Sequence, residues 1–354
     1  MIVHEREPYN AESLRATLAR SDLTPLDGFY VRSHGPVPRA GTDRWRLRVD
    51  GLVAQELELS LEDLRMDFEP REIVATLQCA GNRRVGLIAV ADIPGEAPWG
   101  PGAIGNATWR GVSLPDVLAR AGIRAEADHI AFLGADVSEQ ADPPQQFGAS
   151  IPRHKALASE VLLAWEMNGE PLRPPHGAPL RAVVPGYIGA RSVKWLERIT
   201  AQLEPSENYF QSVAYRLPPP DGRPGPGAGV ALGAVAVNAE ILAPADGECV
   251  AAGPVEVSGY AVAGADRAIV RVEVAIDGDG DRSWKPAELL DDLGPWAWRR
   301  WRASVELPPG PVEVVARAWD TAGATQPEHP GPLWNPKGYV NNSWARVTVM
   351  VEGA

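Results

Sequence analysis

The sequence predicts two domains, an α+β domain followed by an all-β sandwich of immunoglobulin type. Three observations carry this prediction: the length of 354 residues, one segment dense in proline and glycine, and a change of hydrophobic pattern across that segment. A single hydrophobic core rarely grows beyond about 250–300 residues, so a chain of this length is expected to divide. The composition, 45% hydrophobic and 23% charged, is typical of a globular protein.

The division is predicted at LPPPDGRPGPGAG, residues 217–229. Proline fixes φ and removes a backbone donor, so neither a helix nor a central strand is expected here. We therefore predict a first domain over residues 1–216, a linker over 217–229 and a second domain over 230–354.

The first domain shows a mixed pattern. WRLRVDG and IVATLQC are typical of strands, SLEDLRMDF of a short helix, and LPDVLARAGI has helical spacing with proline near its start. Further apolar runs are separated by loops, which is typical of an α+β layout. The elements expected, in order, are 45–51, 60–68, 73–79, 114–123, 129–136, 160–169, 180–186 and 193–203.

The second domain is predicted to consist of short strands. Its segments alternate in polarity or are rich in β-branched residues, and turn sequences at 277–281 and 308–310 separate them. This spacing favours an antiparallel sandwich of immunoglobulin type, although the Cys…Trp…Cys pattern of antibody domains is absent. The strands expected are 255–262, 268–276, 301–307, 312–320 and 344–351.

Charge and hydropathy exclude several classes of protein. The net charge of −12 argues against a nucleic-acid partner bound through phosphate contacts. No run of about 18 apolar residues occurs, so a membrane-spanning helix is not expected. The N-terminal sequence carries acidic residues where a signal peptide has basic ones, and it has no twin-arginine pair. These features predict a cytoplasmic protein.

The chain contains two cysteines, Cys79 and Cys249. Two thiols cannot form a disulfide framework, a cysteine-rich zinc site or an iron–sulfur site. The CxxCH motif for covalent haem attachment is also absent, so no haem is expected in this chain.

Cys79 lies in TLQCAGNRR, residues 76–84, at the end of a predicted strand and before two adjacent arginines. Nearby guanidinium groups favour the thiolate over the thiol, which makes Cys79 a candidate nucleophile or soft-metal ligand. A buried, unreactive cysteine is an equally good interpretation of the motif alone, because a free cysteine packs as a small hydrophobic residue.

The motif LQCAGNRR resembles the signature of the sulfite oxidase family, which also includes the assimilatory nitrate reductases. Further segments resemble the same family in the same order, so the resemblance covers nearly the whole chain. They are YVRSHGPVP at 30–38, GASIPRHKAL at 148–157, the long block at 162–199 and WNPKGYVNNSW at 334–344.

This resemblance implies a sulfite oxidase-like, molybdopterin-binding first domain. The family holds molybdenum through the dithiolene of one pyranopterin and one cysteine thiolate, here Cys79. An arginine fork and a lysine point charge suit a terminal phosphate, which fits Arg181 and Lys194. The positions that match the family's pterin and phosphate contacts are His34, Asp136, His176, Arg181, Ser192 and Lys194.

The resemblance also implies a substrate pocket. Arg32 and Arg84 match arginines of the family's oxyanion site, Tyr215 matches its active-site tyrosine, and Trp99 matches a tryptophan of the pocket wall. Lys337 stands where sulfite oxidases typically have arginine and nitrate reductases an uncharged residue. Lysine keeps the charge but loses the planar fork, so this departure bears on the substrate more than on the cofactor.

The function implied is oxidation of sulfite to sulfate by oxygen-atom transfer, with electrons passed to a separate acceptor. Arg32, Arg84 and Lys337 would orient the anion, and Tyr215 would donate a hydrogen bond. A reductase acting on nitrate or on an S- or N-oxide is the alternative, against which the positive Lys337 weighs. A cofactor-free binding module is a third reading. The family's second domain commonly mediates a twofold dimer, so a homodimer is expected.

Overall fold

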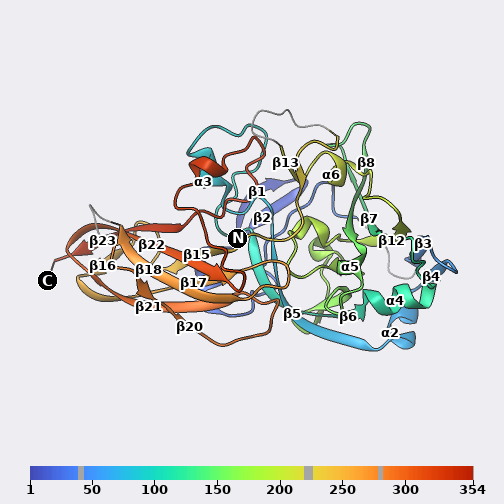
Figure 1. Ribbon diagram of the computed structural model, residues 1–354, viewed down its shortest axis with the longest axis horizontal. Coiled ribbons are helices and arrows are strands. Elements are labelled where there is room, and N and C mark those ends of the chain that lie inside the picture. Colours follow the sequence, from blue (N-terminus) through green and yellow to red (C-terminus); the bar gives the residue numbers. More distant parts are fainter. Residues whose placement is uncertain (39–43, 219–225, 278–281, 354) are drawn as a thin grey trace.

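The computed structural model describes residues 1–38, 44–218, 226–277 and 282–353. Figure 1 shows two lobes, one of mixed helices and strands and one of strands alone, with the N-terminus between them and the C-terminus at the far end of the strand lobe. The order of the lobes along the chain agrees with the predicted α+β domain followed by an all-β domain.

The first lobe contains two five-stranded sheets. One has the order β10-β9-β6-β5, with β11 also paired to β9, and the other has the order β4-β3-β12-β7-β8. The strands of the first sheet are β5 (Pro70–Gln78), β6 (Ile104–Ser113), β9 (Leu162–Met167), β10 (Glu170–Pro171) and β11 (Arg181–Val183). Those of the second are β3 (Leu47–Gly51), β4 (Leu57–Leu59), β7 (His129–Ser138), β8 (Gln145–Pro152) and β12 (Leu196–Gln202).

The helices are short, and sequence signals mark the start of α2 and the end of α4. Ser60 and Asp63 form a capping box at the start of α2, and Gly122 ends α4 in the left-handed conformation at φ 67°. The helices are α1 (Arg15–Arg20), α2 (Leu61–Asp67), α3 (Arg84–Ile88), α4 (Leu114–Ala121), α5 (Arg153–Ala156) and α6 (Tyr209–Ser212), with the 3-10 turns η2 (Pro174–His176), η3 (Gly189–Arg191) and η4 (Gly331–Leu333).

The second lobe is a two-sheet sandwich. Sheets of order β15-β17-β21-β20 and β16-β23-β22-β18-β19 face each other, and valines such as Val257 and Val314 fill the space between them. The pairings are antiparallel except for β16 with β23. All five predicted strands are present. The strands are β15 (Asn238–Ala243), β16 (Cys249–Ala251), β17 (Gly253–Val262), β18 (Ile269–Asp277), β19 (Lys285–Pro286), β20 (Glu288–Leu289), β21 (Arg299–Leu307), β22 (Gly310–Asp320) and β23 (Ala345–Glu352).

A short pair of strands brings together the two ends of the proline-rich segment 217–229. β13 (Arg216–Leu217) pairs antiparallel with β14 (Val230–Ala231), so the two ends of the segment lie side by side. Residues 219–225 of this segment, and residues 278–281 of the turn predicted at 277–281, lie outside the described residues.

Two features join the lobes: the N-terminal segment that lies between them and a shared hydrophobic core. A hairpin of β1 (Ile2–Arg6) and β2 (Tyr9–Glu12), which the sequence pattern did not predict, lies between the lobes, and α1 contacts β15. The hydrophobic core of the first lobe also continues into the second, because it includes Tyr260 and Trp298. The two lobes therefore share packed side chains.

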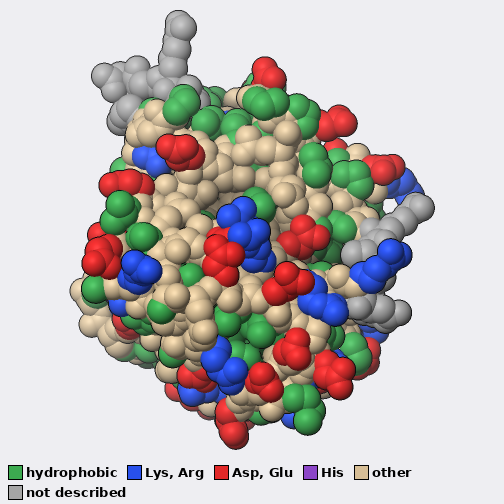
Figure 2. Space-filling view, turned by 90° about the vertical axis from the view of Figure 1, so that its right-hand side faces the viewer, with side chains coloured by type: hydrophobic (Ala, Val, Ile, Leu, Met, Phe, Trp, Pro, Cys, Tyr) green, Lys and Arg blue, Asp and Glu red, His purple; other side chains and the backbone are tan. Residues whose placement is uncertain are grey.

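The described residues include no helix that is both long and apolar enough to cross a membrane. On the face shown in Figure 2, acidic and basic side chains are interspersed and no single basic patch forms.

Candidate active site

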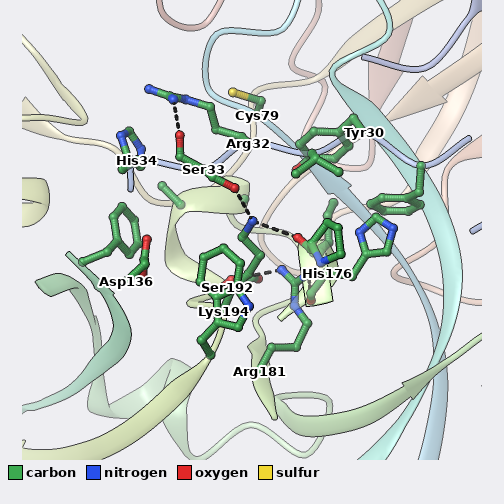
Figure 3. Close-up of a pocket in the computed structure, with 18 of the residues that line it drawn as sticks. Tyr30, Arg32, Ser33, His34, Cys79, Asp136, His176, Arg181, Ser192 and Lys194 are labelled. Atoms are coloured by element: carbon green, nitrogen blue, oxygen red, sulfur yellow. Dashed lines mark hydrogen bonds between the residues drawn. The ribbon is translucent and has the colours of Figure 1, made fainter. Parts of the chain in front are cut away.

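Most of the predicted site residues line one cavity of the first lobe. The empty space of this cavity is about 600 Å³, including the part that is open to solvent. Figure 3 shows Cys79 and Arg32 at one end of it and Arg181 and Lys194 at the other. The predicted residues that line the cavity are Arg32, His34, Cys79, Asp136, His176, Arg181, Ser192, Lys194 and Tyr215.

Cys79 directly follows β5 and is buried as a free thiol. The N–H of Gly81 donates a hydrogen bond to its Sγ at 3.4 Å. Burial raises the pKa of the Cys79 thiol, and the charges of Arg84 and Arg32 oppose that rise without cancelling it. The expectation that nearby arginines would favour the thiolate is therefore only partly met, and a bound metal cation would supply the remaining stabilisation.

The two adjacent arginines after Cys79 have separate partners. Arg83, at a left-handed φ of 63°, donates from Nη1 to the carbonyl of Ser343 at 2.7 Å and pairs with Glu240 at 3.0 Å. It therefore fastens the cysteine loop to the second lobe. Of these two arginines, Arg84 is the one whose charge acts on the Cys79 thiol.

Two cations, buried Arg181 and half-buried Lys194, line the far end of the cavity. Arg181 donates to the carbonyl oxygens of His176 at 2.9 Å and Ser192 at 3.0 Å, and the Lys194 ammonium donates to Ser33 Oγ and to the carbonyl of Pro175, both at 2.9 Å. Burial lowers the pKa of Lys194 and lowers that of Arg181 to about 10. Among the described residues neither cation forms an ion pair.

Buried charges without a counterion are costly, so this arrangement calls for an anionic ligand. A second unmet group is Asp136, whose buried Oδ1 has no hydrogen-bond partner in the described part of the chain. Burial raises the pKa of Asp136 to about 6, against the opposing charge of Lys194. The cavity thus has a free thiol at one end, two cations at the other and an unpartnered carboxyl oxygen between them. These groups fit an elongated cofactor that carries a metal at one end, a pterin, and a phosphate at the other end.

His34 has a contact that sequence reasoning did not anticipate. Its Nε2 lies 2.7 Å from Tyr215 Oη and its Nδ1 lies 2.8 Å from Gln140 Oε1. Burial lowers the pKa of His34, and the charges of Arg32 and Lys194 lower it further. The imidazole is therefore neutral at neutral pH and positions the phenol of Tyr215, whose pKa burial raises.

Arg32 lies beside Cys79 at one end of the cavity (Figure 3). Its Nη1 donates to the carbonyl of Ser33 at 2.7 Å and to Asn10 Oδ1 at 3.2 Å. Asn10 belongs to the N-terminal hairpin and also accepts from the N–H of Ser33 at 2.8 Å. No motif singled out Asn10, because a lone asparagine in a short strand carries no distinctive sequence signal.

Arg84, Lys337 and Trp99 do not line the cavity. Arg84 and Lys337 instead meet at Glu96, a residue that sequence reasoning missed: Glu96 Oε1 lies 3.0 Å from the Lys337 ammonium and Oε2 lies 3.5 Å from Arg84 Nη2. Trp99 is buried and packs edge-on against His4, with ring centroids 4.9 Å apart. The segment around Lys337 does reach back to the first lobe, since Val340 N donates to the carbonyl of Ala80 at 2.8 Å.

The described residues contain no group of three or more His, Cys, Asp or Glu side chains that could hold a metal ion. A pyranopterin dithiolene with one cysteine ligand would require only Cys79 from the protein.

Comparisons with known proteins agree with this geometry. Residues 34–210 match the family model described as the oxidoreductase molybdopterin binding domain, and residues 230–352 match the Mo-co oxidoreductase dimerisation domain. The structure is similar to that of the sulfane dehydrogenase SoxCD from Paracoccus pantotrophus, with a TM-score of 0.83 and 27% identity, covering 98% of this chain and 85% of that one.

The curated relatives include a sulfite oxidase from Gallus gallus, 40% identical over 97% of this chain and 76% of its own length. A mitochondrial sulfite oxidase from Homo sapiens is 41% identical over 99% of this chain, which spans 65% of that relative. An NAD(P)H nitrate reductase from Hordeum vulgare is 36% identical over 98% of this chain and 41% of its own length. The chain is an oxidoreductase whose cofactor is molybdenum–molybdopterin, and it belongs to the sulfite oxidase family.

Proposed function

We propose that this chain oxidises sulfite to sulfate at a molybdenum–molybdopterin centre and passes the electrons to a separate acceptor. The observation that carries the proposal is the cavity that has the Cys79 thiol at one end and, at the other, two cations, Arg181 and Lys194, that form no ion pair among the described residues. The animal sulfite oxidases among the relatives are 39–41% identical to this chain, against 36% for the nitrate reductases and 36% for the sulfite oxidase from Arabidopsis thaliana.

The chain's own residues divide into two sets. Cys79 would bind the metal, and Arg181 and Lys194 would bind the terminal phosphate of the pterin. The remaining pterin contacts that we propose are His34, Asp136, His176 and Ser192. When bound, the cofactor supplies two-electron oxygen-atom transfer.

Substrate orientation falls to the residues at the cysteine end. Arg32 would bind the oxyanion by its guanidinium fork, held in place by Asn10. The phenol of Tyr215 donates to Nε2 of His34, because Nδ1 of the neutral imidazole donates to Gln140 Oε1. Tyr215 would switch this hydrogen bond to an oxygen of the substrate when the substrate binds. Arg84 and Lys337, which do not line the cavity, would add positive charge to the site from outside it.

Several further assignments belong to the same proposal. We assign residues 1–216 to the catalytic domain, 217–229 to the linker and 230–354 to an immunoglobulin-like domain that mediates a homodimer. The match of residues 230–352 to a dimerisation model supports the dimer. The cytoplasmic location predicted from the sequence is tested by cell fractionation, and the dimer by light scattering of the purified protein.

Cofactor content and substrate are tested separately. Protein made in cells that supply the cofactor should contain about one molybdenum and one pterin per chain, and protein without molybdenum would refute the proposal. The loaded enzyme should oxidise sulfite with an artificial one-electron acceptor and should not reduce nitrate with reduced viologen. Arg32→Gln should raise the KM for sulfite at least about tenfold, because it removes a charge-assisted contact to the anion. An unchanged KM would remove Arg32 from the oxyanion site.

A further inference from the structure

A carboxylate stands between two cations that the family resemblance assigns to the oxyanion site. Glu96 Oε1 lies 3.0 Å from the ammonium of Lys337 and Oε2 lies 3.5 Å from Nη2 of Arg84. Glu96 comes from the segment after α3 and Lys337 from the loop of the second lobe that follows η4. The pair therefore joins the two lobes beside the cysteine loop.

The two cations differ in their freedom to move. Arg84 is almost fully buried, and it also donates to the carbonyl oxygens of Ala97 at 2.7 Å and Lys337 at 3.1 Å. Its guanidinium is fixed by these contacts. The Lys337 side chain is 35% exposed, and Glu96 is the one carboxylate that pairs with it in the described part of the chain.

The Glu96 cluster lies close to the reactive end of the cavity. A Cβ on Gly81, two residues after Cys79, would meet the Arg84 guanidinium at 2.5–3.1 Å, so that group packs directly on the cysteine loop. Arg84 also lies over the ring of Tyr339, 5.6 Å from its centroid, and Tyr339 stacks on Tyr215 at 5.3 Å.

The charge of Glu96 also reaches Tyr215, which lines the cavity. Burial is the main cause that raises the pKa of Tyr215, and the charge of Glu96 adds to the rise. A carboxylate that acts on the phenol also acts on an anion bound against it.

We propose that Glu96 selects among anions by charge, by offsetting the positive field of Arg84 and Lys337 at the oxyanion site. Glu96 weakens anion binding there, and it weakens the binding of a dianion more than that of a monoanion. The inference rests on the proposed oxyanion role of this site, and it assigns to Glu96 a part that neither sequence motif nor family model gives it.

The charge dependence follows from Coulomb's law. Removal of one negative charge changes the binding free energy in proportion to the charge of the ligand, so the effect on a dianion is twice that on a monoanion. The factor by which the dissociation constant of the dianion changes is therefore the square of the factor for the monoanion. Sulfate and methanesulfonate are a suitable pair, because both are unreactive tetrahedral sulfur oxyanions and they differ by one charge.

The test is isothermal titration calorimetry of both anions into the molybdenum-loaded enzyme, at constant ionic strength, for wild type, Glu96→Gln and Asp92→Asn. Asp92 is an exposed residue of the same segment for which no ion pair is found among the described residues, so it serves as the matched control. In Glu96→Gln, methanesulfonate should bind about threefold more tightly and sulfate about tenfold more tightly. Asp92→Asn should leave both dissociation constants within about a factor of two.

Three results would overturn the inference: no change in Glu96→Gln, an equal change for both anions, or weaker binding of either. Lys337→Met provides a second variant in case Glu96→Gln loses its cofactor. This variant removes a positive charge, so both anions should bind more weakly. The factor by which the dissociation constant of sulfate rises should be the square of the factor for methanesulfonate. An unchanged ratio of the two dissociation constants would contradict the proposed effect of charge. Failure of the proposed function would look different, since wild type would then bind these anions without oxidising sulfite.

Discussion

At the residue scale, the clearest feature is charge that the protein itself does not neutralise. Arg181 is buried and Lys194 is half-buried, and neither has an ion-pair partner among the described residues; Asp136 keeps an unpartnered oxygen. Such groups lower the stability of the empty protein and are retained where a ligand compensates them. The cavity is therefore arranged for a cofactor that brings negative charge and hydrogen-bond donors.

This arrangement predicts opposite effects of Lys194→Met on stability and on cofactor binding. Methionine fills a similar volume without a buried charge, so the cofactor-free protein should unfold at the same free energy or at one higher by about 1–3 kcal/mol. Pterin content after gel filtration should fall at least about tenfold, because a phosphate contact is lost. Chemical denaturation and pterin fluorescence measure the two quantities. A destabilised variant that keeps its pterin would contradict the phosphate role.

Cys79→Ser separates metal chemistry from pterin binding. The phosphate contacts lie at the other end of the cavity, so the variant should keep its pterin. Sulfite oxidation should fall at least about a hundredfold, because a serine hydroxyl is a harder and weaker ligand than a thiolate for a soft, redox-active metal. Steady-state assays corrected for pterin content check this. Retained activity would return Cys79 to the interpretation of an unreactive buried thiol.

The sequence predicted these residues unequally, for physical reasons. Cys79 and the pterin-contact set lie in segments whose order along the chain resembles one family, so a single resemblance located all of them. Glu96 and Asn10 act by fitting against Lys337 and Arg32, which are distant in sequence. A contact of this kind depends on the tertiary fold and leaves no local pattern.

At the scale of elements, strands with strong apolar patterns were predicted and short polar ones were not. The buried end of β5 and the alternation of β21 appear directly in the sequence. The hairpin of β1 and β2 was missed, because β1 is largely exposed and four-residue β2 is too short to show a period. That hairpin matters for the site, since it supplies Asn10 to Arg32 and brings Glu12 against the segment after Trp99.

Glu12 makes the stability of this hairpin depend on pH. Burial raises the pKa of Glu12 to about 7, although the N–H groups of Gly100 and Gly102 and the charge of Arg15 oppose the rise. A raised pKa in the folded state stabilises the protein below the unfolded pKa, about 4.5, and that stability is lost as pH rises through 7.

Glu12→Gln should therefore raise the free energy of unfolding at pH 8 by about 1–3 kcal/mol and change it little at pH 4.5. Urea unfolding at the two pH values measures the difference. A variant equally stable relative to wild type at both pH values would show that Glu12 ionises normally. Exposed Glu62→Gln in α2 is a control that should show no such pH dependence.

At the scale of the molecule, the two predicted domains form one packed body. The core of the first lobe includes Tyr260, Trp298 and Tyr339 from the second, and Trp298 N donates to Thr76 Oγ1 at 2.7 Å. Composition led to a predicted division of the chain at residues 217–229, but it could not predict how much surface the two parts share. The loop that carries Lys337 and the hairpin of β1 and β2 both cross this boundary, so the site depends on the assembled molecule.

Glu240 provides the sharpest test of this coupling. It lies on β15 in the second lobe, it is buried, and it pairs with two arginines of the first lobe, Arg83 at 3.0 Å and Arg15 at 3.3 Å. Glu240→Gln leaves both cations without their counterion, so the free energy of unfolding should fall by about 3–5 kcal/mol. Glu306→Gln, at an exposed position of β21, should stay within about 0.5 kcal/mol of wild type.

Differential scanning calorimetry should show one transition for wild type and one, shifted to lower temperature, for Glu240→Gln. A single transition is expected because the two lobes share a core and buried ion pairs. Unfolding of either lobe would expose the side chains that the other lobe packs against it, so the two lobes should unfold together. Two resolved transitions, of which only one responds to Glu240→Gln, would mean that the lobes unfold independently. In that case Arg83 would position the Cys79 loop without coupling it to the stability of the second lobe.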